Sequence, residues 1–130
     1  MKTRMLFATA AAVALAASLT MAGDEKAAAV AKADEKVNVV KGEVLDLSCY
    51  LGHGGMGEGH AGCAAKCVKG GAPVGLLGAD GTVYVLFADH SDAAPYEQVK
   101  DLAGKKVEVT GDVASKSGMK GITVHGVKAL

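Results

Sequence analysis

The chain has 130 residues, in which 14 Lys and Arg balance 14 Asp and Glu, so its formal net charge is zero. Binding along a phosphate backbone requires a basic patch, and binding to bases by stacking requires aromatic rings. The chain has no Trp, three Tyr and two Phe, and we therefore expect no nucleic-acid partner.

The N-terminal segment has the pattern of a secretory signal peptide. Lys2 and Arg4 form a short basic start, residues 5–19 are an apolar run, and small residues flank Met21 up to Ala22. We expect signal peptidase to cleave after Ala22. The apolar run is shorter than the about 20 residues that a membrane span needs, so we expect no stable membrane anchor. The protein is therefore predicted to be secreted, into a periplasm.

The remaining chain divides into a tether and one domain. After removal of the signal peptide (1–22), residues 23–36 are rich in Ala, Lys, Asp and Glu without an apolar stripe, which is typical of a solvated flexible segment. Residues 37–130 then form a single domain with a modest core. Loss of Lys2 and Arg4 leaves the exported chain slightly acidic.

Three short strands are predicted in the first two thirds of the domain. Residues 37–47 are rich in β-branched side chains, with Gly42 at a position where a strand could bulge and bend. Residues 73–77 and 82–88 are two further strands. The Asp80-Gly81 pair between them is typical of a hairpin turn.

The last third predicts a helix and a second hairpin. Pro95 opens a short helix, which Gly104 closes as a C-terminal cap. Residues 105–113 and 122–127 then alternate between apolar and polar side chains, with Val107 and Val109 facing inward. Five strands with a helix between the third and fourth indicate an all-β OB-fold-like Greek-key barrel, with a second short helix in an insertion between strands one and two.

All three cysteines of the chain lie in that insertion or at its start, together with two histidines. The sulfur and imidazole cluster consists of Cys49, His53, His60, Cys63 and Cys67. Thiolate and neutral imidazole are the ligands that zinc and cuprous copper prefer, so the cluster predicts a metal or redox site. The loop between strands one and two is also a common ligand position on an OB-fold.

The spacing of the cluster predicts one shared helical face. Residues 61–69 are predicted to form a helix ended by a Gly-Gly pair, and at about 100° per residue His60, Cys63 and Cys67 fall within about 60° of one another. Cys49, on the end of the first strand, approaches that face. We therefore predict Cys49, His60, Cys63 and Cys67 as ligands of zinc or copper(I).

Two other side chains are candidates for additional ligands. His53 and Met56 lie in the glycine-rich run 51–60, where either can swing toward the cluster or remain part of a mobile loop. By contrast, His125 alternates with Thr123 and Val127 on the last strand and is interpreted as a surface or hydrogen-bonded barrel residue.

Two alternatives to metal binding remain open at this point. An exported protein readily forms disulfides, and a bridge from Cys49 to Cys63 or Cys67 would pin the insertion helix to the barrel and stabilise the fold by about 2 to 4 kcal/mol. This protein would then be a disulfide-stapled interaction module with one free thiol. A thiol-redox protein, in which such a bridge forms reversibly, is the third interpretation.

Two sequence patterns resemble a known group of proteins. The segment 102–113 (LAGKKVEVTGDV), followed by 121–124 (GITV), is similar to the closing hairpin of small secreted bacterial OB-fold proteins. The segments 46–50 (DLSCY), 60–67 (HAGCAAKC) and 71–75 (GAPVG) resemble a set of such proteins that share a Cys-Tyr and His-x-x-Cys-x-x-x-Cys pattern. The resemblance implies the fold and an exported location, and it brings no activity with it.

No catalytic pattern is legible in the chain. There is no Ser, His and acid arrangement, no Cys-x-x-Cys-His haem attachment motif, no thioredoxin-type Cys-x-x-Cys pair and no phosphate loop. We therefore expect that the protein is not an enzyme. Its expected partner is a metal ion. Another protein is a further candidate partner, and the disulfide-stapled interaction module would require one. Metal carriage, sensing or delivery is the predicted role.

Overall fold

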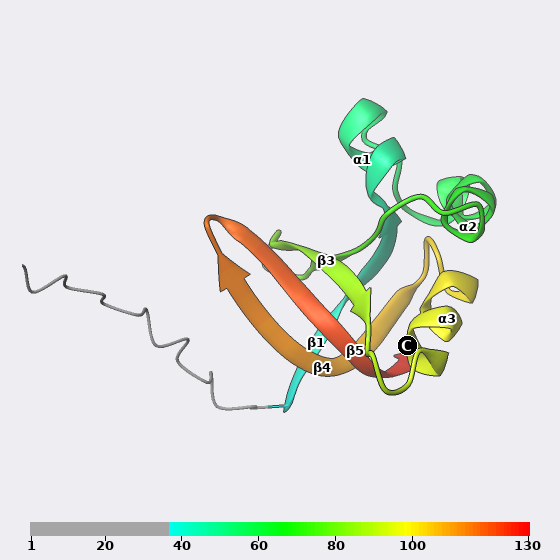
Figure 1. The fold of residues 1–130 in the computed structure, drawn as a ribbon. Coiled ribbons are helices and arrows are strands. Elements are labelled where there is room, and N and C mark those ends of the chain that lie inside the picture. Colours follow the sequence, from blue (N-terminus) through cyan, green and yellow to red (C-terminus); the bar gives the residue numbers. More distant parts are fainter. Residues whose placement is uncertain (1–36) are drawn as a thin grey trace, which may run out of the picture. The chain divides into compact units, whose positions relative to one another are not determined.

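The computed structural model describes residues 37–130 (Figure 1). The predicted signal peptide, 1–22, and tether, 23–36, lie outside these residues. Within the part of the chain that the structure describes, no helix is long and apolar enough to cross a membrane.

Five strands close into a barrel. They are β1 (Val37–Asp46), β2 (Val74–Gly78), β3 (Val83–Ala88), β4 (Lys106–Lys116) and β5 (Met119–Ala129). Their order around the barrel is β1-β2-β3-β5-β4, with β4 pairing back onto β1. The β3–β5 pair is parallel and all other pairs are antiparallel. The five predicted strands and the two predicted hairpins are therefore confirmed, with β4 and β5 longer than expected.

Within residues 37–130, the strands of the barrel have one irregularity, and it does not lie at the glycine where the sequence predicted a bulge. The pairing of β4 with β5 shifts register between Thr110 and Gly111, which is typical of a β-bulge. The bulge expected at Gly42 is absent, since Gly42 pairs regularly with β2 and with β4. Instead, the Leu77 carbonyl of β2 lies where a Cβ of Gly42 would be, so glycine is needed there for close strand approach.

The core fills the barrel and extends to two helices. Alternation along β4 buries Val107 and Val109 completely, as predicted. Val99 from the helix before β4 packs on the same cluster, as do Ala64 and Val68 from a helix between β1 and β2. These contacts attach both helices to the barrel.

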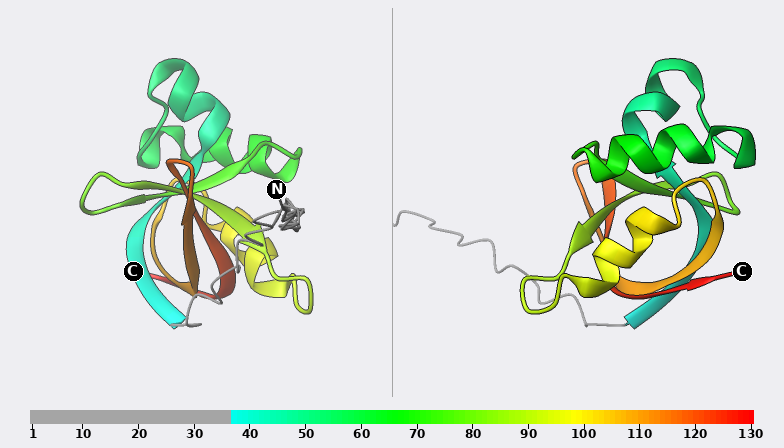
Figure 2. Two further views of the ribbon diagram at one scale, coloured as in Figure 1. Left: turned by 60° about the vertical axis from the view of Figure 1, so that its left-hand side comes forward. Right: turned by 90° about the vertical axis from the view of Figure 1, so that its right-hand side faces the viewer.

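The structure contains more helix than predicted. The helices are α1 (Leu47–His53), the 3-10 turn η1 (Glu58–His60), α2 (Ala61–Lys69) and α3 (Ala94–Asp101). The bounds of α2 agree with the prediction, but α1 was not predicted. The first strand, expected to reach Leu47 and to carry Cys49 at its end, stops at Asp46. Figure 2 shows α1 and α2 at one end of the barrel, with α1 farther from the strands than α2.

The connection from α3 to β4 passes close to the start of α2. Gly104 lies beyond the end of α3 and is not its C-cap, which is Leu102. Gly104 has φ of 75° and donates its N–H to the Val44 carbonyl at 2.8 Å. A Cβ on Gly104 would lie 2.5 Å from the Ala61 Cα, so this glycine allows the connection to pack against α2.

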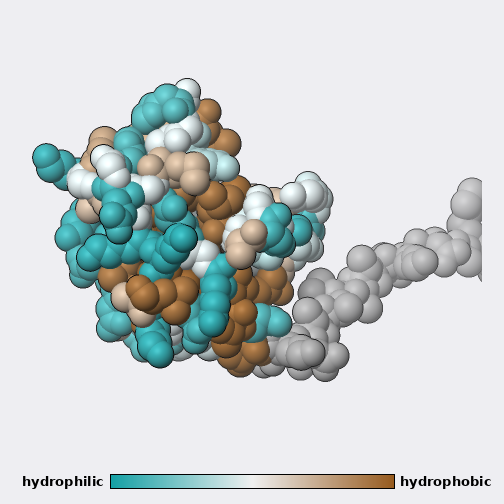
Figure 3. Space-filling view, turned by 180° about the vertical axis from the view of Figure 1, so that it is seen from behind, coloured by the Kyte–Doolittle hydropathy of each residue, from teal (hydrophilic) through white to brown (hydrophobic). Residues whose placement is uncertain are grey.

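The surface mixes hydrophobic and hydrophilic residues. Figure 3 shows this on the face opposite to the one seen in Figure 1. The exposed large hydrophobic residues are Val37, Val39, Leu51, Met56, Phe87, Met119 and Leu130. They come from distant parts of the chain, and exposed apolar residues of this kind are ordinary on protein surfaces.

Candidate metal centre

Helix α1 carries Cys49 and His53 four residues apart, on one side of the helix. The helix begins because the Asp46 side chain accepts hydrogen bonds from the backbone N–H groups of Ser48, at 2.8 Å, and Cys49, at 3.4 Å. It ends at Gly54, whose left-handed conformation, with φ of 70°, allows its N–H to bond back to the last turn. These two caps define where α1 begins and ends.

Helix α2 carries Cys63 and Cys67, again four residues apart. Ala64 and Val68 follow each cysteine directly and are buried in the core, so the neighbouring face of α2 packs on the barrel. The cysteines lie beside that buried face. Cys63 is exposed and Cys67 is half-buried, and neither is in a disulfide.

The structure brings the sulfur and imidazole atoms into two overlapping groups. The thiol sulfurs of Cys49, Cys63 and Cys67 all lie within 4.8 Å of one another. The Cys49 sulfur also lies within 4.8 Å of a ring nitrogen of His53 and of His60, and these two nitrogens lie within the same distance of each other. Cys49 is therefore shared by a sulfur triad and a histidine triad.

This arrangement differs from the four-ligand set predicted from the helical face. His60 groups with Cys49 and His53, rather than forming one compact set with all three cysteines. His53, expected only as an additional ligand, has the same place in its triad as His60. Met56, the other additional candidate, has a side chain that is 48% exposed, and its thioether remains a prediction.

His60 occupies a position where glycine gives it room. It is the last residue of η1, directly before α2, and its ring packs edge-on against the His53 ring at a centroid distance of 5.4 Å and an angle of 70°. A Cβ on Gly55 would lie 2.7 Å from the His60 Nε2 atom. The glycine-rich run therefore packs closely against the His60 imidazole at Gly55. The sequence alone did not predict this contact.

Two buried polar atoms at this cluster lack hydrogen-bond partners. Among the side chains of residues 37–130, the buried atoms without a partner are Asp46 Oδ2 and His60 Nε2. An unsatisfied buried polar atom costs about 1 to 3 kcal/mol, and an ion or an ordered water is a common explanation. Both atoms belong to residues at the cluster, where an additional partner would satisfy them.

The Asp46 carboxylate is the main electrostatic influence on the thiols. Asp46 is only 1% exposed. Burial opposes its ionisation, but interaction with the Cys49 thiol, the backbone N–H groups of Cys49 and Ser48, and the Cys67 thiol outweighs burial and lowers the pKa of Asp46. A negative charge is therefore held directly beside two of the three thiols.

The same contact keeps the neighbouring thiols protonated. The contact with the Asp46 carboxylate, followed by desolvation and by the negative charges around it, raises the pKa of Cys49 to about 12. The contact with the Asp46 carboxylate is also the largest cause that raises the pKa of Cys67, ahead of desolvation and the contact with Cys63. Both thiols are consequently neutral at pH 7, and a metal ion that binds them must displace protons.

The spacing of the donors suits a small metal ion. Thiolate sulfurs bound at about 2.3 Å lie about 3.8 to 4.0 Å apart around a tetrahedral or trigonal ion. The sulfur triad, with every pair within 4.8 Å, needs only a small contraction to reach this geometry. Zinc would take a fourth ligand, whereas cuprous copper is satisfied by three soft donors.

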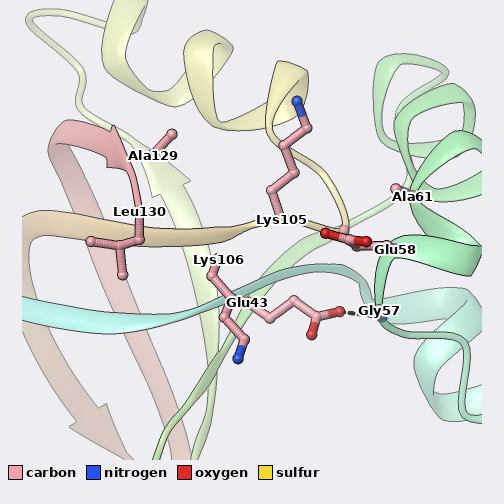
Figure 4. Close-up of a pocket in the computed structure, with 9 residues that line it drawn as sticks. Glu43, Gly57, Glu58, Ala61, Lys105, Lys106, Ala129 and Leu130 are labelled. Carbon is pink, nitrogen blue, oxygen red and sulfur yellow. Dashed lines mark hydrogen bonds between the residues drawn. The ribbon is translucent and has the colours of Figure 1, made fainter.

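A pocket of about 680 Å³ lies beside the segment that leads to His60 (Figure 4). Glu43 on β1 lines it and accepts a hydrogen bond from the Gly57 N–H. This contact ties the glycine-rich run to the barrel just before η1. Neither Glu43 nor Asp46 was identified from the sequence as a residue of the site. A signal for Asp46 was present, because an Asp followed eight residues later by the Gly54-Gly55 pair is compatible with the N-cap and C-cap of a short helix.

Comparisons with protein-family models, curated proteins and solved structures gave no match to this chain. The functional argument therefore depends on the geometry and chemistry of the cluster itself.

Proposed function

We propose that the protein is an exported metal-binding protein that takes zinc or cuprous copper at Cys49, Cys63 and Cys67, with histidine as an additional donor. The observation that carries this proposal is the sulfur triad, in which two helices bring three free thiols within 4.8 Å of one another. Three thiols in one place have a high affinity for soft ions once their protons are displaced.

The role we propose is metal carriage, sensing or delivery. Cys63 is exposed, so an incoming chelator or partner protein can reach at least one of the sulfur donors directly. A site that is reached from solvent favours exchange of its ion, whereas a structural zinc site is usually closed. We also interpret the barrel as an OB-fold, because its strand order and single parallel pair agree with that topology and the cluster lies between the first two strands.

The proposal is for a binding protein and not an enzyme. A catalytic or redox-active cysteine normally has a lowered pKa, since the thiolate is the nucleophile. Here the Asp46 carboxylate raises the pKa of both Cys49 and Cys67. The raised pKa of both thiols argues against a thiol-redox protein, which needs a reactive thiolate.

Metal uptake by the reduced exported protein tests the proposal. The wild type and a variant with all three cysteines changed to Ser are prepared anaerobically and incubated with zinc or with cuprous copper. After gel filtration, the metal content and the number of titratable thiols are measured, and circular dichroism compares the folds. We expect bound metal in the wild type and none above background in the variant.

Equal metal content in the two proteins would overturn the proposal. If the protein isolated from the periplasm also had a mass about two daltons below the reduced value and only one free thiol, the disulfide-stapled module would be the correct interpretation. Three free thiols and a metal adduct would instead exclude that alternative.

A further inference from the structure

The two triads of the cluster share only one residue. Cys63 and Cys67 come from α2, whereas His53 comes from the end of α1 and His60 from the end of η1. Cys49 on α1 completes both groups, with each set of three donor atoms lying within 4.8 Å. A single ion placed among the three sulfurs therefore leaves the two histidines unused.

We infer that the cluster binds two cuprous ions, one in the sulfur triad and one in the histidine triad, with the Cys49 thiolate bridging them. This inference rests on the proposed function and specifies the metal, the number of ions and the second set of ligands. The second position consists of Cys49, His53 and His60.

The chemistry of the donors supports two low-coordinate ions. A thiolate sulfur has more than one lone pair and can bind two soft ions at once. Each triad offers three donors, which suits cuprous copper, and imidazole is a common copper ligand. Zinc prefers four ligands, and the described part of the chain groups no fourth Cys, His, Asp or Glu with either triad, so each zinc ion would need a water molecule to complete its coordination.

The buried His60 nitrogen is an independent observation in favour of the second position. His60 Nε2 is buried without a hydrogen-bond partner and lies against Gly55. The same ring packs against the His53 ring, and one of its two nitrogens lies within 4.8 Å of the Cys49 sulfur. A metal-ligating histidine normally uses one ring nitrogen for the metal and the other for a hydrogen bond. An ion in the histidine triad would give the His60 ring a metal to bind, whereas an ion in the sulfur triad would leave this ring without one.

Electrostatics also favours two cations over one. Three thiolates and the Asp46 carboxylate bring several negative charges together, and Asp46 is almost fully buried. A second monovalent ion offsets more of this charge than a single one does.

The stoichiometry of cuprous copper binding tests the inference. The reduced protein is titrated anaerobically with copper(I) against a coloured copper(I) chelator, and the bound ions are counted by native mass spectrometry. The variants are His53→Ala with His60→Ala, and Cys63→Ser with Cys67→Ser. His90→Ala removes an exposed histidine outside the cluster and is the matched control.

We expect two ions in the wild type and in His90→Ala, and one ion in each double variant. X-ray absorption of the doubly loaded wild type should show a short copper–copper distance, because one sulfur bridges both ions. Circular dichroism of the copper-free variants checks that each fold is retained, so that a lost ion reports a lost ligand.

Other outcomes separate this inference from the proposed function. A wild type that binds one ion, with the histidine double variant unchanged, overturns the second position and leaves the sulfur site intact. Two ions in the histidine double variant would also overturn it, since the second ion would then not require these ligands. A wild type that binds neither copper nor zinc would remove the proposed function as well.

Discussion

Asp46 has two separable roles, which its two carboxylate oxygens make visible. Oδ1 caps α1 by accepting the backbone N–H groups of Ser48 and Cys49, while Oδ2 is buried without a hydrogen-bond partner. The negative charge interacts with the thiols of Cys49 and Cys67. Because asparagine keeps a side-chain oxygen but loses the charge, it separates capping from electrostatics.

Asp46→Asn should make the Cys49 thiol more reactive in the metal-free protein. The pKa of Cys49 is raised to about 12 chiefly by its contact with the carboxylate, so removal of the charge should lower this pKa. Each unit of decrease gives about tenfold more thiolate below the pKa but a less nucleophilic one, a net increase of about threefold in rate. The measurement is the alkylation rate of Cys49 at fixed pH, followed by peptide mass spectrometry.

Asp80→Asn is the matched control for this experiment, because Asp80 is an exposed carboxylate in the β2–β3 turn that accepts hydrogen bonds from Thr82. It should leave the alkylation rate of Cys49 unchanged. A Cys49 rate that is equal in wild type and Asp46→Asn would contradict the assigned cause of the raised pKa.

The elements of the barrel could be predicted because their signals are local. Alternating apolar side chains define β4 and β5, the Asp80-Gly81 turn defines the β2–β3 hairpin, and the spacing of Cys63 and Cys67 places them on α2. Such patterns depend on a few neighbouring residues. The structure has these elements within one to a few residues of the predicted bounds.

Helix α1 could not be read in the same way, and the arrangement of the site depends on it. Its seven residues include a glycine and have no apolar stripe. They directly follow a run of β-branched residues, so the sequence predicted a longer strand and no helix here. The helix depends on the Asp46 cap and the Gly54 turn. Because Cys49 lies on this helix and not on a strand, His53 comes into reach of the cluster and His60 groups with it.

Asp46→Ala should destabilise the protein, and Asp46→Asn should destabilise it much less. Alanine removes the N-cap of α1, a loss that typically costs about 0.5 to 2 kcal/mol. The free energy of unfolding of both variants is measured by urea denaturation of the metal-free protein. Equal stability of the alanine variant and the wild type would show that the cap does not stabilise α1.

Gly57→Ala should destabilise the segment that leads to His60. Gly57 has φ of 76° and ψ of 177°, a backbone region that is essentially restricted to glycine, and its N–H bonds to Glu43. No atom lies within 4 Å of a Cβ built there, so the expected cost of about 1 to 3 kcal/mol comes from the backbone alone. Urea denaturation measures it.

Gly59→Ala provides the control, since Gly59 lies in η1, has no positive φ and also has open space where an alanine Cβ would lie. Its stability should remain close to that of the wild type. If the two alanine variants were equally stable, the conformation assigned to Gly57 would be wrong.

At the scale of the molecule, the cluster lies outside the barrel but is attached to its core. None of the three cysteines belongs to the buried core cluster, so changing them to Ser should leave the barrel folded. Helix α2, however, carries Cys63 and Cys67 on one face, and its neighbouring face packs Ala64 and Val68 into the core. A metal ion that holds α2 to α1 therefore also opposes the unfolding of the barrel.

Metal binding should consequently raise the melting temperature of the whole described domain. A ligand that binds only the folded state, at about 100 times its dissociation constant, stabilises that state by about 2.7 kcal/mol. For a domain of this size the gain corresponds to a shift on the order of 10 °C. The measurement is thermal unfolding with and without zinc or copper(I), followed by the far-ultraviolet sheet signal, and the triple Cys→Ser variant should show no shift. If metal bound to the wild type without moving the sheet transition, α1 and α2 would unfold independently of the barrel, and the packing of Ala64 and Val68 would not couple the site to the core.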